Sequence, residues 1–123
     1  MIVTASIDTI RKWIRGDGGS PPTNIAVGVG TTAPAITDTA MTDEIYPTTS
    51  RNACTITNSE NVVHYYMTQA TDEGSTSTYA EQGLFSNSTT GTIFSRQTHP
   101  DIKKDNTVIM DSIIGVEVSS YLP

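Results

Sequence analysis

The clearest pattern of apolar and polar positions lies near the end of the chain, over residues 106–119. Successive side chains of a β-strand point to opposite faces, so alternation predicts a strand with one buried side. Asp111 and Glu117 fall on the polar face. The apolar face, which only Ser112 interrupts, consists of Val108, Met110, Ile114, Val116 and Val118.

Six earlier segments have the same β character. Each is short, contains β-branched or aromatic residues, and is bounded by Gly, Pro, Asn, Asp or Ser, which is typical of strands separated by turns. The first of these segments ends in the glycine-rich turn at Gly28 and Gly30. The sequence predicts strands at about residues 24–30, 44–49, 52–58, 61–70, 76–86 and 91–98.

One segment has helical periodicity instead. Ile7, Ile10 and Ile14 recur at spacings of three and four, Ser6 is a candidate N-cap, and Gly16 is a candidate stop. We therefore expect a short helix over residues 6–15, followed by a loop rich in Gly and Pro.

The number and order of these segments predict a mainly β fold. With 123 residues the chain has the length of one domain, residues 1–123, with one hydrophobic core. The 21 threonines favour strands because their β-branched side chains suit a half-exposed pleated surface. Short strands and a single helix match a β-sandwich or jelly roll better than any βαβ arrangement.

A hairpin is predicted around the polar segment 87–91. If Ser86 faces Gly91, Glu81 lies opposite Arg96 and Phe94 covers Gly83. Glu81 and Arg96 then form a cross-strand ion pair, worth less than about 1 kcal/mol if exposed. The residues expected to pack in this hairpin are Gly83, Leu84, Phe85, Gly91, Ile93 and Phe94.

Charge and composition exclude several classes of partner. The net charge of −6 and the low isoelectric point disfavour nucleic-acid binding. The sequence contains neither a secretory signal pattern nor an apolar run long enough to cross a membrane, so we expect synthesis as a cytosolic protein. Cys54 is the single cysteine, which excludes an internal disulfide.

No catalytic, metal or cofactor motif is expected to function. Gly28 and Gly30 imitate a dinucleotide fingerprint, but Pro34 follows where a helix is needed. His64 and His99 have no second ligand at metal-binding spacing, and nothing near Cys54 marks a thiol nucleophile. We therefore expect a protein that is not an enzyme and that has no metal or cofactor.

Several motifs occur in an order that resembles a family of small tailed-phage and archaeal-virus structural proteins. The resemblance extends from the helix to the last strand, although the spacing between Glu44 and Arg51 is longer than in the family pattern and leaves the role of Arg51 open. It rests on residues 24–34, on Thr37-Asp38-Thr39-Ala40-Met41, on Glu44 with Arg51, and on residues 81–85, 91–96 and 102–104.

The resemblance implies a β-sandwich used in tail, fibre, baseplate or capsid-surface components, without a cofactor. We therefore expect a virion structural protein that packs against itself, as a homo-oligomer such as a trimer, and against other virion proteins. The charge-poor surface supports self-association, with Trp13 and Ile14 as the candidate interface. The alternative is a carbohydrate- or receptor-binding module, with a host receptor as its partner, whose aromatic platform would draw on Trp13, Tyr46, Tyr65, Tyr66, Tyr79 and Tyr121.

Overall fold

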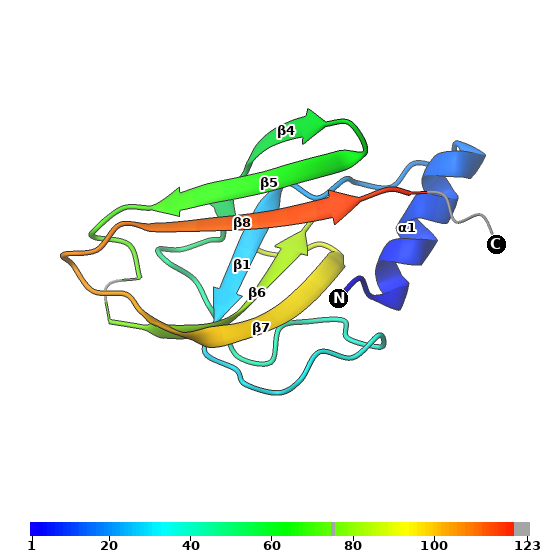
Figure 1. The fold of residues 1–123 in the computed structure, drawn as a ribbon. Helices are drawn as coiled ribbons and strands as arrows, with labels where there is room; N and C mark the ends of the chain where they lie inside the picture. The colour runs from blue at the N-terminus through cyan, green and yellow to red at the C-terminus, as the bar shows by residue number, and fades with distance from the viewer. Residues whose placement is uncertain (75, 120–123) are drawn as a thin grey trace.

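The computed structural model describes residues 1–74 and 76–119, and it is mainly β (Figure 1). Two antiparallel sheets face each other, and a helix, α1 (Thr4–Arg15), lies at one end of them. The mainly β, sandwich-like fold predicted from the sequence is therefore confirmed. Within the described residues, no helix has the length and apolar character needed to cross a bilayer.

The larger sheet has the strand order β2-β1-β6-β7, and β3 also pairs with β1. The smaller sheet has the order β4-β5-β8. The strands of the larger sheet are β1 (Asn24–Gly28), β2 (Glu44–Ile45), β3 (Asn52–Ala53), β6 (Thr78–Phe85) and β7 (Ile93–Lys103). Those of the smaller sheet are β4 (Thr55–Ser59), β5 (Val62–Gln69) and β8 (Met110–Glu117).

The helix begins earlier than the sequence suggested. Val3 is the N-cap and makes no side-chain cap, whereas Ser6 is fully buried and donates its hydroxyl to the carbonyl of Val3 at 2.6 Å. The prediction of Ser6 as the N-cap is therefore wrong. The predicted stop is confirmed, because Gly16 has the left-handed conformation, with φ of 74°, that ends many helices.

Two predicted strands differ from the structure. The segment 44–49 forms only the two residues of β2, and the segment 52–58 divides at Cys54 into β3 and β4. β3 pairs with β1 in one sheet and β4 pairs with β5 in the other, so the chain changes sheets at this residue. The backbone N–H of Cys54 is satisfied by the carbonyl of Thr23 at 2.8 Å.

The last two strands also differ in extent. β7 continues to Lys103, beyond the predicted end at residue 98. In β8 the predicted alternation is present, and Met110, Ser112 and Ile114 point into the sandwich. Val108 and Val118 lie outside the strand and are exposed, contrary to the prediction, because the facing sheet does not cover either end of β8.

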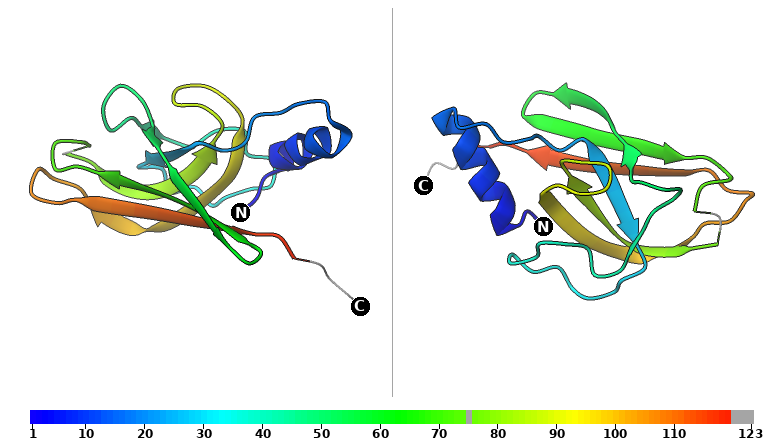
Figure 2. Two further views of the ribbon diagram at one scale, coloured as in Figure 1. Left: turned by 90° about the horizontal axis from the view of Figure 1, so that it is seen from above. Right: turned by 180° about the vertical axis from the view of Figure 1, so that it is seen from behind.

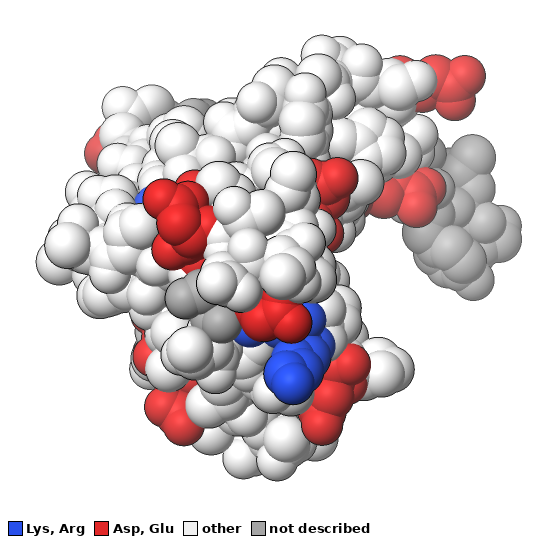
Figure 3. Space-filling view, turned by 90° about the vertical axis from the view of Figure 1, so that its left-hand side faces the viewer, with Lys and Arg blue, Asp and Glu red and all other residues white. Residues whose placement is uncertain are grey.

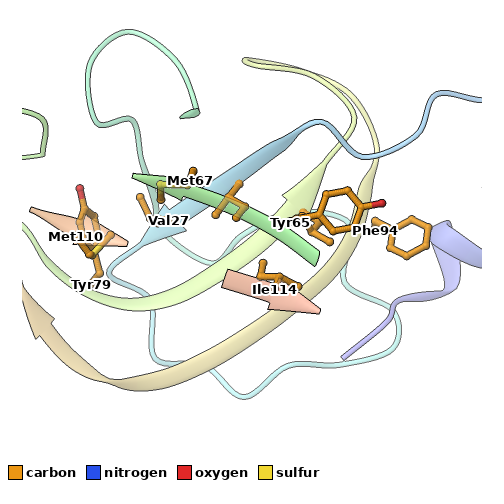
Figure 4. Packing of buried hydrophobic residues seen from close by; sticks show 9 residues of the cluster. Val27, Tyr65, Met67, Tyr79, Phe94, Met110 and Ile114 are labelled. Carbon is orange, nitrogen blue, oxygen red and sulfur yellow. The ribbon is translucent and has the colours of Figure 1, made fainter. Parts of the chain in front are cut away.

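The main core fills the space between the sheets (Figure 4). It contains side chains from β1, β5, β6, β7 and β8: Ile25, Val27, Tyr65, Met67, Tyr79, Leu84, Phe94, Met110 and Ile114. A second cluster lies on the other face of the larger sheet, where Val3 and Met41 cover Ala26, Phe85 and Ile93. All five residues of β1 are therefore buried, as expected for a strand that is covered on both faces.

Candidate functional site

An open apolar groove of about 480 Å³ lies between α1 and the adjacent ends of β5 and β8. Trp13 forms part of one wall, and Val63 and Val116 form part of the other. The groove exists because α1 packs mainly on β7, so the inner-face valines at the end of the smaller sheet remain only half-buried. The remaining lining residues are Ile2, Ile10, Tyr65, Phe94, Glu117, Val118 and Ser119.

The indole of Trp13 is held at the rim of this groove. Its ring stacks on Phe94 with centroids 6.3 Å apart, and its Nε1 donates a hydrogen bond to the carbonyl of Gly19 at 3.0 Å. The side chain is still 39% exposed, and that of Ile14 beside it in sequence is 82% exposed. Both residues of the predicted interface are therefore accessible to a partner, but Trp13 lines the groove whereas Ile14 does not.

A buried ion pair organises the opposite face of the larger sheet. Arg96 Nε lies 2.9 Å from Glu81 Oε2, and both residues are fully buried. The two residues were predicted to lie directly opposite each other, but Glu81 faces Thr98 and Arg96 faces Gly83. The register differs from the predicted one by two residues: Phe85 faces Ile93 instead of Thr92, and a bulge between Leu84 and Phe85 adds a second residue. An even shift keeps both side chains on one face and makes the pair diagonal.

Glu81 fills a cradle of backbone N–H groups. Its carboxylate accepts hydrogen bonds from Gly30 at 3.3 Å, Thr42 at 3.1 Å and Asp43 at 2.7 Å. A Cβ at Gly28 would lie 2.5 Å from Glu81 Oε1, and one at Gly30 would lie 2.7 Å from it. The glycines that imitate a phosphate-binding loop therefore make room for a carboxylate of the protein itself.

The pKa of Glu81 is lowered, although burial alone would raise it. The hydrogen bonds from Asp43 and Thr42 and the charge of Arg96 favour the ionised form more strongly. Arg96 in turn pairs with Asp38 at 3.0 Å and donates to the carbonyl of Thr32 at 2.7 Å. This network fixes the long connection between β1 and β2, which is a structural role.

Arg51 has a similar role at the hairpin turn between β6 and β7. It pairs with Glu44 through two hydrogen bonds, of 2.6 and 2.9 Å, and its guanidinium lies 3.7 Å from the centre of the Phe85 ring. The same side chain donates to the carbonyls of Asn87 at 3.0 Å and Thr90 at 2.6 Å. Arg51 thus connects the turn 86–92 to Glu44 of the larger sheet.

The residues predicted to pack in the hairpin are mostly buried there. Leu84, Phe85 and Ile93 are almost completely buried. Gly91 has a φ of 89° and allows the turn. The expected cover of Gly83 by Phe94 is wrong: a Cβ at Gly83 would meet Met41 Sδ at 2.9 Å and the carbonyl oxygen of Ser95 at 2.8 Å, whereas Phe94 stacks on Trp13.

The sequence candidates for metal or thiol chemistry lie in different places. His64 is on β5, and His99 is on β7, where its Nδ1 lies 2.8 Å from the carbonyl oxygen of Pro100. Burial raises the pKa of the Cys54 thiol to about 11, so it is protonated near neutral pH. Among residues 1–74 and 76–119, no three His, Cys, Asp or Glu side chains gather as a metal site would require.

The aromatic residues suggested for a carbohydrate platform are also dispersed. Tyr65 and Tyr79 belong to the core. Tyr46 donates its hydroxyl to the carbonyl of Thr89, and Tyr66 lies on the outer face of the smaller sheet. Tyr121 lies outside the described residues. Trp13 is therefore the exposed aromatic side chain that lines the groove, and the groove is the candidate functional site.

The chain was compared with models of protein families, with curated proteins and with solved structures. No family model, curated protein or solved structure matches the chain. The groove and the charge distribution of the chain itself therefore carry the functional argument, together with the sequence motifs.

Proposed function

We propose that this chain is a non-enzymatic structural component of a tailed-virus particle, and that it works by packing against copies of itself and neighbouring virion proteins. The sequence motifs that resemble virion structural proteins suggest the setting. The structural observation that carries the proposal is the open apolar groove beside α1, with Trp13 at its rim.

The composition of the groove suits a protein interface better than a catalytic site. Its walls are mostly aliphatic and aromatic, and Glu117 supplies the charged side chain among the lining residues. Large contiguous apolar surfaces on soluble proteins mark interaction sites, and buried tryptophans are frequent hot spots in them. A partner that covers the groove would remove these side chains from water.

The remaining surface also favours close packing. Charged residues make up only 16% of the chain, and three of the seven basic side chains, Arg51, Arg96 and Lys104, are buried. An exposed surface rich in Thr and Ser loses less hydration free energy on contact than one rich in Lys and Glu. This property suits a protein that is surrounded by neighbours in a particle.

Detection of the chain in purified particles tests the proposed setting. Particles from cells that carry its gene would be separated on a density gradient and digested for quantitative mass spectrometry. We expect the chain to co-sediment in a fixed ratio to the other virion proteins. Its absence from the particles would overturn the proposal, and specific glycan binding that Trp13→Ala abolishes would favour the carbohydrate-binding alternative.

A further inference from the structure

The exposed basic side chains are concentrated on one element. Residues 1–17 carry three of the seven basic and two of the thirteen acidic side chains, so their formal charge is +1 and that of the remaining chain is −7. The three basic residues, Arg11, Lys12 and Arg15, are all exposed on α1. Since Arg51, Arg96 and Lys104 are buried, Lys103 is the one exposed basic side chain outside α1 in the described residues.

The opposite end of the molecule is acidic and partly apolar. The β5–β6 and β7–β8 connections lie there, far from α1 (Figures 1 and 2). Viewed from this end, the surface shows several separate acidic areas and one main basic area, which lies between two of them (Figure 3). We call the exposed and half-buried charged and larger aliphatic residues of these connections and of the adjoining end of β7 the acidic tip: Asp72, Glu73, Asp101, Ile102, Lys103, Asp105, Val108 and Ile109. Its four carboxylates outnumber its one basic side chain, Lys103.

Two adjacent aliphatic residues at this tip are exposed to solvent. Ile109 is 63% exposed, and Val108 beside it is also exposed. Turns of this kind usually contain polar residues, as do positions 105–107 just before them. Exposed Val and Ile side chains in such a turn are a second apolar surface, at the end of the molecule remote from the groove.

Lys104 links the two connections that form the tip. This side chain is fully buried, and its Nζ donates to the carbonyls of Thr71 at 3.3 Å and Asp105 at 3.1 Å. The lysine therefore ties the β5–β6 connection to the β7–β8 turn. A surface that is already ordered loses less conformational entropy when it binds.

We propose that the acidic tip of one copy docks into the groove beside α1 of the next, with Val108 and Ile109 in the groove and the tip carboxylates toward the exposed basic side chains of α1, which lie on the helix outside the groove lining. This inference rests on the part of the proposed function in which copies of the chain pack against one another. The groove volume of about 480 Å³ lies within the range of ligand pockets, roughly 300–1,000 Å³.

Electrostatic complementarity favours a contact between the tip of one copy and the α1 end of the next over a contact between two identical ends. Two α1 surfaces brought together would oppose basic residues, and two tips would oppose carboxylates, whereas tip against α1 pairs opposite charges. The second wall of the groove bears Glu117, which accepts a hydrogen bond from Asn61 at 3.2 Å, so the tip carboxylates face the α1 side. A head-to-tail contact closes into a ring, such as a trimer, or grows into a filament.

Three aspartate substitutions at exposed sites test the contact in the full-length chain. Val118→Asp places a charge in the groove, and Ile109→Asp places one at the tip. Ile113→Asp is the matched control, because Ile113 is also 63% exposed but lies on the outer face of β8. Circular dichroism establishes that each variant is folded, and sedimentation velocity measures its association.

We expect the wild-type chain and Ile113→Asp to self-associate to the same extent. Val118→Asp and Ile109→Asp should each weaken self-association by about tenfold or more. A mixture of these two variants should form a dimer that grows no further, because each supplies the intact end that the other lacks. If two grooves contact each other instead, Ile109→Asp should self-associate as the wild type does, and mixing it with Val118→Asp should form no additional dimer. That result would overturn the proposal.

Charge reversal supplies a second readout. Arg11→Glu with Arg15→Glu, or Asp72→Lys with Asp101→Lys, should weaken association, and mixing the two double variants should restore it through the swapped pair of ends. Added salt should weaken the wild-type contact. An association that survives either reversal unchanged would contradict the proposed orientation.

Two further outcomes would overturn the head-to-tail contact. If a chain that ends at Ser119 loses association while Ile109→Asp retains it, residues 120–123 are the occupant of the groove and the proposal is wrong. If the chain is found in particles but remains monomeric with every variant, the head-to-tail contact fails while the virion role stands.

Discussion

Arg96 and Glu81 form a fully buried ion pair, with 2.9 Å between Nε and Oε2, although they do not face each other in the β6–β7 ladder. Each belongs to a wider set of hydrogen bonds that fixes the connection between β1 and β2. A charge that loses its partner inside a protein is costly, because water no longer solvates it. The first predictions follow from this pair.

Glu81→Gln should destabilise the chain by about 3 kcal/mol, because it leaves the Arg96 guanidinium without its buried counter-charge. Urea unfolding measures the change. Asp8→Asn is the control, since Asp8 forms only exposed ion pairs on α1 and its loss should cost less than about 1 kcal/mol. Equal losses for the two variants would contradict a special role of the buried pair.

The lowered pKa of Glu81 predicts a dependence of stability on pH. A carboxyl group with a lower pKa in the folded state stabilises the fold above its unfolded pKa, near 4.5, and loses this contribution as pH falls through the folded value. The stability difference between wild type and Glu81→Gln should therefore shrink as pH falls below about 4.5. Urea midpoints along a pH series measure it, and a difference independent of pH would refute this assignment.

Arg51→Lys should loosen the turn 86–92 while leaving the fold intact. Lysine cannot reproduce the two-bond pairing with Glu44 or the flat contact with Phe85, so we expect a loss of about 1–2 kcal/mol. Hydrogen exchange should accelerate at the amides of this turn. Arg11→Lys, at an exposed site on α1, should change neither quantity.

Cys54 should react slowly with iodoacetamide in the folded protein. Its pKa of about 11 leaves only a very small thiolate fraction at neutral pH, and the thiolate is the reactive form. The alkylation rate should rise with pH toward that value and increase sharply in urea. Rapid modification of the folded chain at neutral pH would show that the thiol is activated.

Chelation should leave the melting temperature unchanged. The described residues contain no group of His, Cys, Asp and Glu suited to a metal ion, and the polar cradle near Gly30 is filled by Glu81. Scanning calorimetry with and without a chelator measures this. A lower melting temperature that one divalent ion restores would reveal a metal that stabilises the fold.

The sequence by itself determined the elements and their approximate positions, because strand alternation, helical spacing and turn residues are local properties. It predicted the mainly β sandwich, the helix ending at Gly16, and the inward-facing pattern of β8 from Met110 to Ile114. It also placed Glu81 and Arg96 on one face, since a register shift of two residues preserves the face of every side chain.

Only the tertiary structure decided how these elements meet. The burial of the Glu81–Arg96 pair depends on the connection 29–43 folding over it, and the role of Gly28 depends on a carboxylate that is 53 positions later in the chain. The groove likewise forms because α1 packs on β7 and leaves the ends of β5 and β8 uncovered. These relationships join residues distant in sequence, and local patterns carry no information about which distant surfaces exclude water from each other.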